Sequence, residues 1–232
     1  MHTLSLKSSL LLSLAIVLGI ATSVLAQESD LKPLGDWQQA KNSNGVTVYV
    51  RKIEAEPGRV EHQLKAEMEM TASLSAAVAT LRDEKNLTSW INRAVECYNF
   101  NIRDNHYWNN YIQFHIPWPL NNQDVVTGNI LSQDSVTRKV TLHIYDDNSK
   151  LPPRNHVDRI PSFEGSWTIT PRENGKIFLS YTIYAGQKPW LPWWAISVFV
   201  EYGVWKTLID MRDVIEEKYE ANVHLNYIRE KQ

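Results

Sequence analysis

The sequence predicts an α+β fold in which an antiparallel sheet is closed by one long C-terminal helix. Alternating apolar and polar runs follow one another through most of the chain, which is the pattern of half-buried strands. A segment with helical spacing then begins near Pro192 and ends the domain. Because a sheet closed by a helix leaves a hollow interior, this order of elements predicts a protein that holds something apolar.

Length and composition bound the class of protein. A chain of 232 residues is long enough for one domain with a substantial core, and 43% hydrophobic residues is ordinary for a globular protein. The formal charge of -2 argues against binding of nucleic acid, which needs a basic patch. The 9 Trp residues favour cores, apolar pockets and wet interfaces. Cys97, the single cysteine, is expected to be a small buried apolar residue.

The N-terminus has the features of a secretory signal. Lys7 precedes an apolar run over residues 10–20, and Val24-Leu25-Ala26 supplies the pattern of a cleavage site. The run is shorter than the roughly 20 residues that span a bilayer. We therefore expect residues 1–26 to be a signal peptide and the protein to be exported, either to the periplasm or to the medium. An uncleaved membrane anchor is the alternative.

The remainder of the chain has no repeat and no long linker. We expect one domain over residues 31–219 and a C-terminal tail over residues 220–232. Turn signals at Asn44-Gly45, Pro57-Gly58 and Asn174-Gly175 separate alternating runs. The expected strands lie near residues 46–50, 60–70, 96–103, 107–115, 124–132, 139–145, 163–170 and 176–184.

A short helical region interrupts the strands. Thr71 is a suitable N-cap, and Leu74 and Val78 follow it at helical spacing. The segment from there to Ile91 is expected to be short helix and turn, and it carries Trp90.

The C-terminal helix changes character along its length. Its second part carries an apolar stripe made of Val200, Val204, Leu208, Met211, Ile215 and Tyr219. Residues 193–200 are instead apolar on almost every side. We expect this first part to pack on the sheet with one face and to line or gate the mouth of a cavity with the other. The alternative is a helix covered entirely by its own loops.

Several short motifs occur in a particular order along the chain. They are Trp37 with Gly45-Val46-Thr47-Val48-Tyr49, then Trp90, then Pro119-Leu120-Asn121-Asn122-Gln123-Asp124-Val125-Val126, then Arg159 with Gly165-Ser166-Trp167-Thr168-Ile169-Thr170-Pro171, and finally Leu191-Pro192-Trp193. In order and spacing this set resembles the START family, the steroidogenic-acute-regulatory-related lipid-transfer domains. The resemblance covers about Trp37 to Tyr219.

The resemblance implies a helix-grip fold of the START or Bet v 1-like type, with a curved antiparallel sheet wrapped around the C-terminal helix and an internal hydrophobic cavity. It further implies that the cavity holds one sterol, phospholipid, ceramide, carotenoid or similar lipid, exchanged during transient contact with a membrane surface. Gln123-Asp124 stands where Arg-Asp is common, and Asn129 falls where cholesterol-binding members carry an inward Arg. The resemblance therefore does not imply cholesterol as the ligand.

The expected ligand site combines aromatic walls with a few inward polar groups that fix orientation. Gln113 and His115 share a face of one strand, and Asn129 lies on another; the alternative for each is a solvent-facing strand residue. For the aromatic members of the set, the alternative is that they are simple core residues. Replacing Val198 by Trp is expected to block lipid uptake. The ligand-binding set is Trp90, Tyr111, Gln113, His115, Asn129, Trp167, Tyr181, Trp194, Val198 and Tyr202.

Signals of catalysis are weak. The histidines have no metal spacing such as H-E-x-x-H, and neither a Gly-rich phosphate loop nor a G-x-S-x-G motif occurs. We expect no catalytic residue, no metal site and no cofactor, and a monomer that binds and transfers a lipid. The alternative is a cyclase-, aromatase- or hydrolase-like enzyme on the same fold. A third possibility is a module whose apolar helix face binds another protein.

Overall fold

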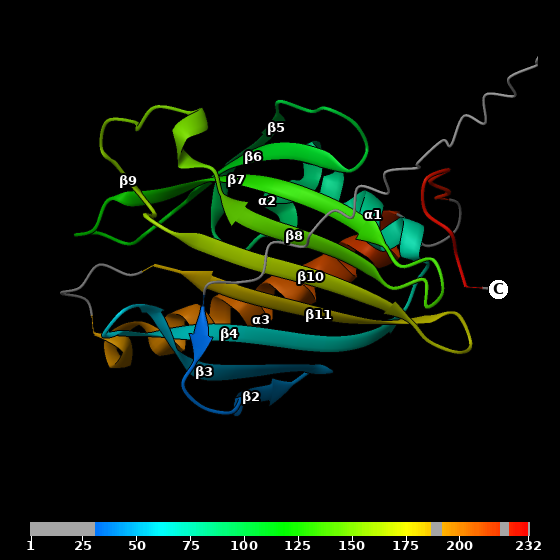
Figure 1. The fold of residues 1–232 in the computed structure, drawn as a ribbon, viewed down its shortest axis with the longest axis horizontal. Coiled ribbons are helices and arrows are strands. Elements are labelled where there is room, and N and C mark those ends of the chain that lie inside the picture. Colours follow the sequence, from blue (N-terminus) through cyan, green and yellow to red (C-terminus); the bar gives the residue numbers. More distant parts are fainter. Residues whose placement is uncertain (1–30, 187–191, 219–222, 232) are drawn as a thin grey trace, which may run out of the picture.

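Figure 1 shows the computed structural model, which describes residues 31–186, 192–218 and 223–231. The expected signal peptide at residues 1–26 and Tyr219 lie outside these ranges. In chain order the elements are β1 (Lys32–Pro33), β2 (Gln38–Ser43), β3 (Val46–Glu56), β4 (Arg59–Thr71), α1 (Leu74–Arg82), η1 (Glu84–Asn86), α2 (Leu87–Trp90), β5 (Ala94–Phe100), β6 (Tyr107–Phe114), β7 (Asn122–Gln133), β8 (Val140–Asp146), η2 (Asn148–Lys150), β9 (Val157–Arg159), β10 (Phe163–Pro171), β11 (Lys176–Ala185) and α3 (Trp193–Lys218).

The strands form one curved sheet in the order β1-β3-β4-β11-β10-β8-β7-β6-β5 (Figure 1). Strand β2 pairs with β3, and β9 lies parallel to β7; the other pairs are antiparallel. The predicted α+β class with a large antiparallel sheet and a long C-terminal helix is confirmed. Each of the eight expected strands is present, although β3 and β7 are longer than the runs that predicted them.

The predicted turns owe their geometry to residues that tolerate positive φ. Asn44 and Gly45 have φ of 53° and 77° between β2 and β3, and Asn174 and Gly175 have φ of 58° and 68° between β10 and β11. Two consecutive positive φ values are the requirement of a type I′ hairpin, which Asn-Gly satisfies with little strain. These turns fix the register of both hairpins.

Helix α1 begins two residues later than expected. Thr71 is the last residue of β4 and pairs with Lys176, so the prediction of Thr71 as the N-cap is wrong. Ser73 is the N-cap, and its Oγ accepts from the Ala76 N–H at 3.0 Å. The Glu230 carboxylate accepts from the two preceding N–H groups of the helix. Residues 223–231 thus pack on the domain, and Ile228 is buried in its core.

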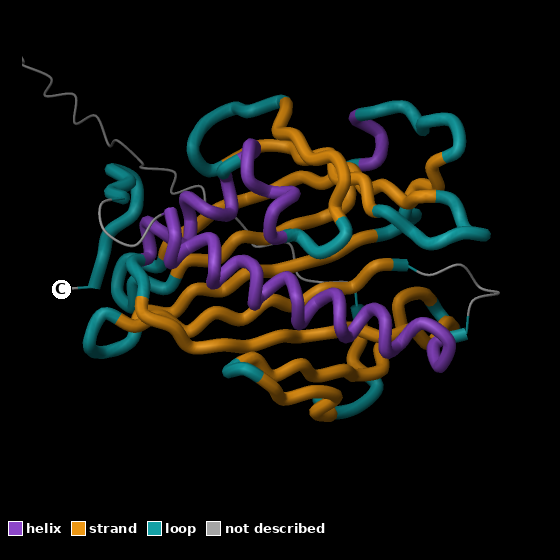
Figure 2. Tube along the Cα trace, turned by 180° about the vertical axis from the view of Figure 1, so that it is seen from behind, coloured by secondary structure: helices purple, strands orange, loops and turns teal. Residues whose placement is uncertain are grey.

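Helix α3 lies across one face of the sheet (Figure 2). The predicted stripe is confirmed in its described part, because Val204, Leu208, Met211 and Ile215 are buried and Val200 is half-buried against the core. At its start, the Trp193 ring stacks on His62 of β4 with the ring centroids 4.1 Å apart. Within the described ranges no helix is both long and apolar enough to cross a bilayer.

Candidate functional site

A cavity of about 460 Å³ lies between the sheet and α3. Strands β6, β7, β8, β10 and β11 supply one wall, and α2 and the first half of α3 supply the other. Most lining side chains are apolar, such as Ile112, Leu142, Ile183 and Val200. The cavity is therefore suited to a hydrophobic molecule rather than to a polar one.

Three aromatic rings in contact with one another line the cavity. Trp167 of β10 stacks on Tyr181 of β11 with 4.1 Å between ring centroids and 12° between ring planes. Trp90 of α2 meets Trp167 edge to face at 6.0 Å. Burial raises the pKa of the Tyr181 phenol, so its hydroxyl stays protonated at neutral pH. The trio forms a rigid apolar wall.

A polar group interrupts the apolar lining where β6 and β7 run side by side. Asn129 of β7 is 2% exposed, and its Nδ2 donates to Asn110 Oδ1 at 2.7 Å. The same Nδ2 lies 3.3 Å from the Trp108 carbonyl oxygen and 3.4 Å from Thr127 Oγ1. Asn110, Thr127 and Asn129 all line the cavity.

The mouth is formed by the start of α3 and by the segment that joins β6 to β7. Trp118 in that segment is 91% exposed and also lines the cavity. Phe199 of α3 lies beneath Arg93, whose guanidinium is 3.9 Å from the ring centroid. Arg93 is the one charged residue among the described lining residues, and it is exposed. Positive charge is thus confined to the rim.

Four of the ten residues predicted to bind ligand line the cavity, namely Trp90, Asn129, Trp167 and Tyr181. Three others occupy the solvent side of α3, where Trp194, Val198 and Tyr202 are 80%, 78% and 44% exposed. Their spacing of four residues places them on one stripe of the helix. The apolar start of α3 therefore has two roles, because Ile196 and Val200 face the cavity instead.

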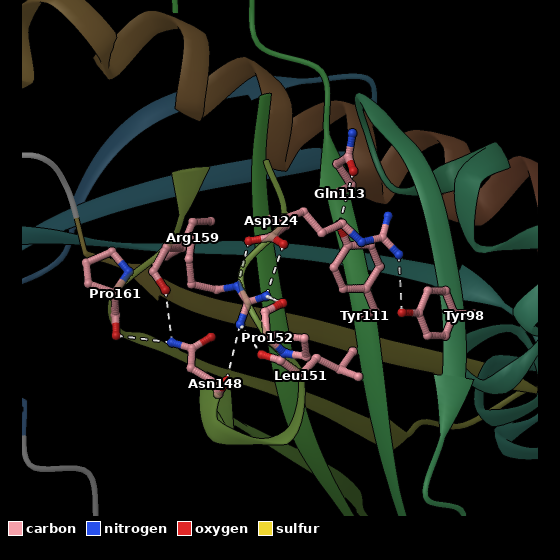
Figure 3. Close-up of polar contacts among 11 residues, drawn as sticks. Tyr98, Tyr111, Gln113, Asp124, Asn148, Leu151, Pro152, Arg159 and Pro161 are labelled. Atoms are coloured by element: carbon pink, nitrogen blue, oxygen red, sulfur yellow. Dashed lines mark hydrogen bonds and ion pairs between the residues drawn. The ribbon is translucent and has the colours of Figure 1, made fainter. Parts of the chain in front are cut away.

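The last three predicted residues do not line the cavity either. In β6 the cavity-facing residues are Asn110, Ile112 and Phe114, so Tyr111 and Gln113 point to the other side of the sheet. Figure 3 shows Tyr111 donating to Gln113 on that side, at 3.0 Å. His115 follows β6 and is exposed.

The outer cluster around Tyr111 is structural. Tyr111 is fully buried because Tyr98 stacks on it at 5.0 Å and the Arg154 guanidinium lies 4.1 Å from its ring centroid. Beside it, Arg159 binds Asp124 with two hydrogen bonds of 2.6 and 3.1 Å (Figure 3). Arg159 also donates to carbonyl oxygens of the segment after β8. This buried ion pair holds that segment on β7.

Sequence reasoning missed Asn110, Ile112, Phe114 and Thr127 as lining residues. Strand β6 carries aromatic residues and amides on both faces, so its alternation does not identify the inner face. A register error of one residue moves every side chain to the other face. The inward position expected for Asn129 on the paired strand β7 was the available signal, because Asn129 is opposite Trp108 and two residues from Thr127, the partner of Asn110.

Groups of His, Cys, Asp or Glu that could hold a metal do not occur among the described residues. Cys97 is half-buried against the core, and burial raises the pKa of its thiol to about 12. The thiol therefore stays protonated at neutral pH, as expected of an apolar residue.

The comparisons with known proteins agree on the fold. A STAR-related lipid transfer protein from Xanthomonas axonopodis superposes with a TM-score of 0.70 and 24% identity, over 79% of this chain and all of that one. Human STARD10 superposes with a TM-score of 0.65 and 20% identity, over 78% of this chain and 74% of that one. Human StAR-related lipid transfer protein 5 superposes with a TM-score of 0.66 and 12% identity, over 81% of this chain and 89% of that one. The chain therefore has a START-like fold.

Among sequences, the chain is 24% identical over 204 residues to an uncharacterised protein of Pseudomonas aeruginosa, which covers 88% of this chain and 95% of that protein. No family model matches the chain.

Proposed function

We propose that the protein binds one lipid or similar hydrophobic molecule in its cavity, without catalysis, and transfers it between membranes. The observation that carries the proposal is the cavity of about 460 Å³ lined mainly by apolar side chains. An acyl chain or ring system gains about 25 cal/mol for each Å² of apolar surface removed from water. The Xanthomonas protein and one of the human proteins with this fold are named as lipid transfer proteins, which supports the same conclusion.

The titratable groups support binding rather than catalysis. General acid–base catalysts work best with a pKa near the operating pH. Among the described lining residues the titratable side chains are Arg93 and Tyr181, and burial moves the pKa of Tyr181 away from that range. The interior can therefore solvate a neutral apolar molecule but offers no group suited to exchanging protons with it.

The mouth is suited to contact with a membrane surface. Trp194 and Val198 of α3 are exposed, and Trp118 is exposed on the opposite rim. Exposed apolar side chains gathered at one site mark an interaction surface. A lipid leaving the cavity at this mouth enters the bilayer without crossing water. We further propose that the protein is exported and acts as a monomer.

The test of binding is native mass spectrometry of the protein purified from its own host, followed by organic extraction and identification of lipids. We expect one lipid class at a ratio of one molecule per chain. A protein that is empty and also takes up no lipid from mixed vesicles contradicts the proposal and favours an enzymatic role of the cavity.

The test of docking compares two valines of similar exposure. Val198 at the mouth is 78% exposed, and Val136 in the turn between β7 and β8 is 85% exposed. We expect Val198→Ser together with Trp194→Ser to reduce co-sedimentation with lipid vesicles, whereas Val136→Ser has no effect. Equal co-sedimentation of all variants contradicts docking through this mouth while leaving binding in the cavity intact.

A further inference from the structure

A chain of three asparagine amides runs across the sheet towards the cavity. Asn99 of β5 donates through Nδ2 to the Arg82 carbonyl oxygen at 3.1 Å. Asn110 of β6 donates through Nδ2 to Asn99 Oδ1. Asn129 of β7 donates through Nδ2 to Asn110 Oδ1 at 2.7 Å. Each Asn side-chain oxygen in the first two links thus accepts from the Nδ2 of the following Asn, and all donation runs in the same direction, away from the cavity.

The direction of the chain is fixed by the Trp108 indole. Its Nε1 lies 3.1 Å from Asn110 Oδ1, and an indole nitrogen can only donate. Asn110 must therefore present its oxygen to Trp108 and to Asn129. With that oxygen opposite, Asn129 must present its Nδ2, because the reverse orientation would bring two acceptors together.

This orientation leaves Asn129 Oδ1 as the terminal acceptor. No side chain or N–H group in the described part of the chain donates to it, whereas Nδ2 has Asn110, Trp108 and Thr127 as neighbours. Asn129 is 2% exposed and lines the cavity. An acceptor that faces an apolar cavity without a donor from the protein is costly unless a bound molecule supplies the donor, and the upstream amides polarise it further.

We propose that the bound lipid carries a hydrogen-bond donor, a hydroxyl or amide N–H, that donates to Asn129 Oδ1. The inference rests on the proposed function, since it specifies the chemistry of the molecule in the same cavity. The donor group is neutral, because the only charged lining residue in the described ranges, Arg93, lies at the exposed rim. A buried charge without a partner would be strongly unfavourable beside Asn129.

The position of Asn129 orients the ligand. Asn129 pairs with Ile144 of β8, and Leu142, two residues along β8, pairs with Trp167. Asn129 therefore lies two residues along the strand direction from the set of paired residues that includes Trp167 of the aromatic wall. A lipid enters with its donor group towards Asn129 and the adjoining apolar part along Trp167 and Tyr181.

The test uses dodecanol and its methyl ether, in which a methyl group replaces the hydroxyl hydrogen and removes the donor. Binding is followed through the fluorescence of the cavity tryptophans. We expect the protein to bind the alcohol about tenfold to a hundredfold more tightly than the ether, the range that an unsatisfied buried acceptor implies. A ratio near one means that Asn129 is satisfied by water, and it overturns the proposal.

Two amide-to-leucine variants locate the effect. Asn129→Leu is expected to bring the ratio close to one while the ether still binds. Gln113→Leu, on the face of β6 that points away from the cavity, is expected to keep the preference of the original protein. Thermal unfolding is measured first, and Asn129→Ala replaces Asn129→Leu if the latter does not fold. A preference that survives loss of the Asn129 amide overturns the proposal.

The failure of this inference differs from the failure of the proposed function. Copurification of a lipid without any O–H or N–H group, or uptake of lipid without binding of either probe, overturns the donor assignment and leaves lipid binding intact. A protein that binds neither probe and neither carries nor takes up any lipid overturns both.

Discussion

Gly128 shows how a single residue shapes the outer face of the sheet. The Tyr145 ring of β8 lies directly over Gly128 of β7, so closely that an added Cβ would overlap it. Tyr145 is held there by stacking on His143 and by the Tyr107 hydroxyl. The absence of a side chain at Gly128 lets this aromatic cover close over the strand, and the φ angle has no part in it.

We expect Gly128→Ala to lower the free energy of unfolding by about 1–3 kcal/mol, because the ring has to move out of its site. The matched control is Gly165→Ala on β10, where the nearest atoms to an added Cβ lie at 3.5 Å, an ordinary contact. Urea unfolding of the two variants checks the difference. A smaller loss at Gly128 than at Gly165 contradicts the argument.

Which side chains reach the cavity could be predicted only where one face of a strand is distinctly apolar. In β10, Trp167 and Ile169 alternate with Ser and Thr, so the inward placement of Trp167 followed from the sequence. Strand β6 gave no such contrast, and Tyr111 was placed on the wrong face. Tyr111 is fully buried from the outside by Arg154, a residue 43 positions away in sequence that no local pattern connects with it.

Among the elements, α3 divides its apolar residues between the cavity and the solvent. Val200 lines the cavity, whereas Val198, two residues earlier, is 78% exposed. A separation of two residues on a helix places side chains on nearly opposite faces. The earlier expectation that Val198→Trp blocks uptake is therefore replaced by one that concerns Val200.

We expect Val200→Trp to fill part of the cavity and to abolish lipid uptake, whereas Val198→Trp, which keeps an apolar side chain on the exposed face, still takes up lipid. Both variants carry the same new side chain on the same helix, so only its direction differs. Uptake from fluorescently labelled vesicles measures the effect, with circular dichroism to establish folding. Equal uptake by the two variants would place the ligand elsewhere.

The second element of interest is α1, whose first turn is completed from the distant segment 223–231. Glu230 accepts from the Leu74 and Ser75 N–H groups at 2.9 and 2.8 Å. A carboxylate at a helix N-terminus satisfies free donors and interacts favourably with the helix dipole. The isolated sequence of α1 gave no indication of this partner.

We expect Glu230→Ala to destabilise the fold by about 1–2 kcal/mol and to speed hydrogen exchange at the first turn of α1. The control is Glu216→Ala on the exposed side of α3, which should change the stability little. Unchanged exchange at Leu74 and Ser75 in the first variant would show that the cap is dispensable.

At the scale of the whole molecule, the sequence was most informative. The order of strand pair, short helix, meander and long C-terminal helix predicted the class, because each of these elements has a strong local signal. Contacts between elements far apart in sequence had no local signal in the sequence. The pairing of β4 with β11 follows from the closure of the sheet, which only the complete chain defines.

Stability should fall at alkaline pH. Burial raises the pKa of Tyr181, and it raises that of Tyr184 to about 12, from an ordinary value of 10.0. A raised pKa in the folded state gives stability that is fully present below pH 10 and is lost as the pH rises through about 12, because the unfolded chain releases these protons first. Unfolding free energies measured on both sides of pH 10 check this. No decline would mean that these phenols are solvated.

The capping of α1 by Glu230 also bears on protein synthesis. Glu230 follows Leu74 by 156 positions, so the ribosome makes every described strand of the sheet, and α3, before the helix receives its carboxylate. A product terminated before residue 228 leaves the first turn of α1 uncapped and removes Ile228 from the core. Such truncated chains are less stable and more open to proteases than the longer product. The first turn of α1 is therefore completed only once translation has passed residue 230.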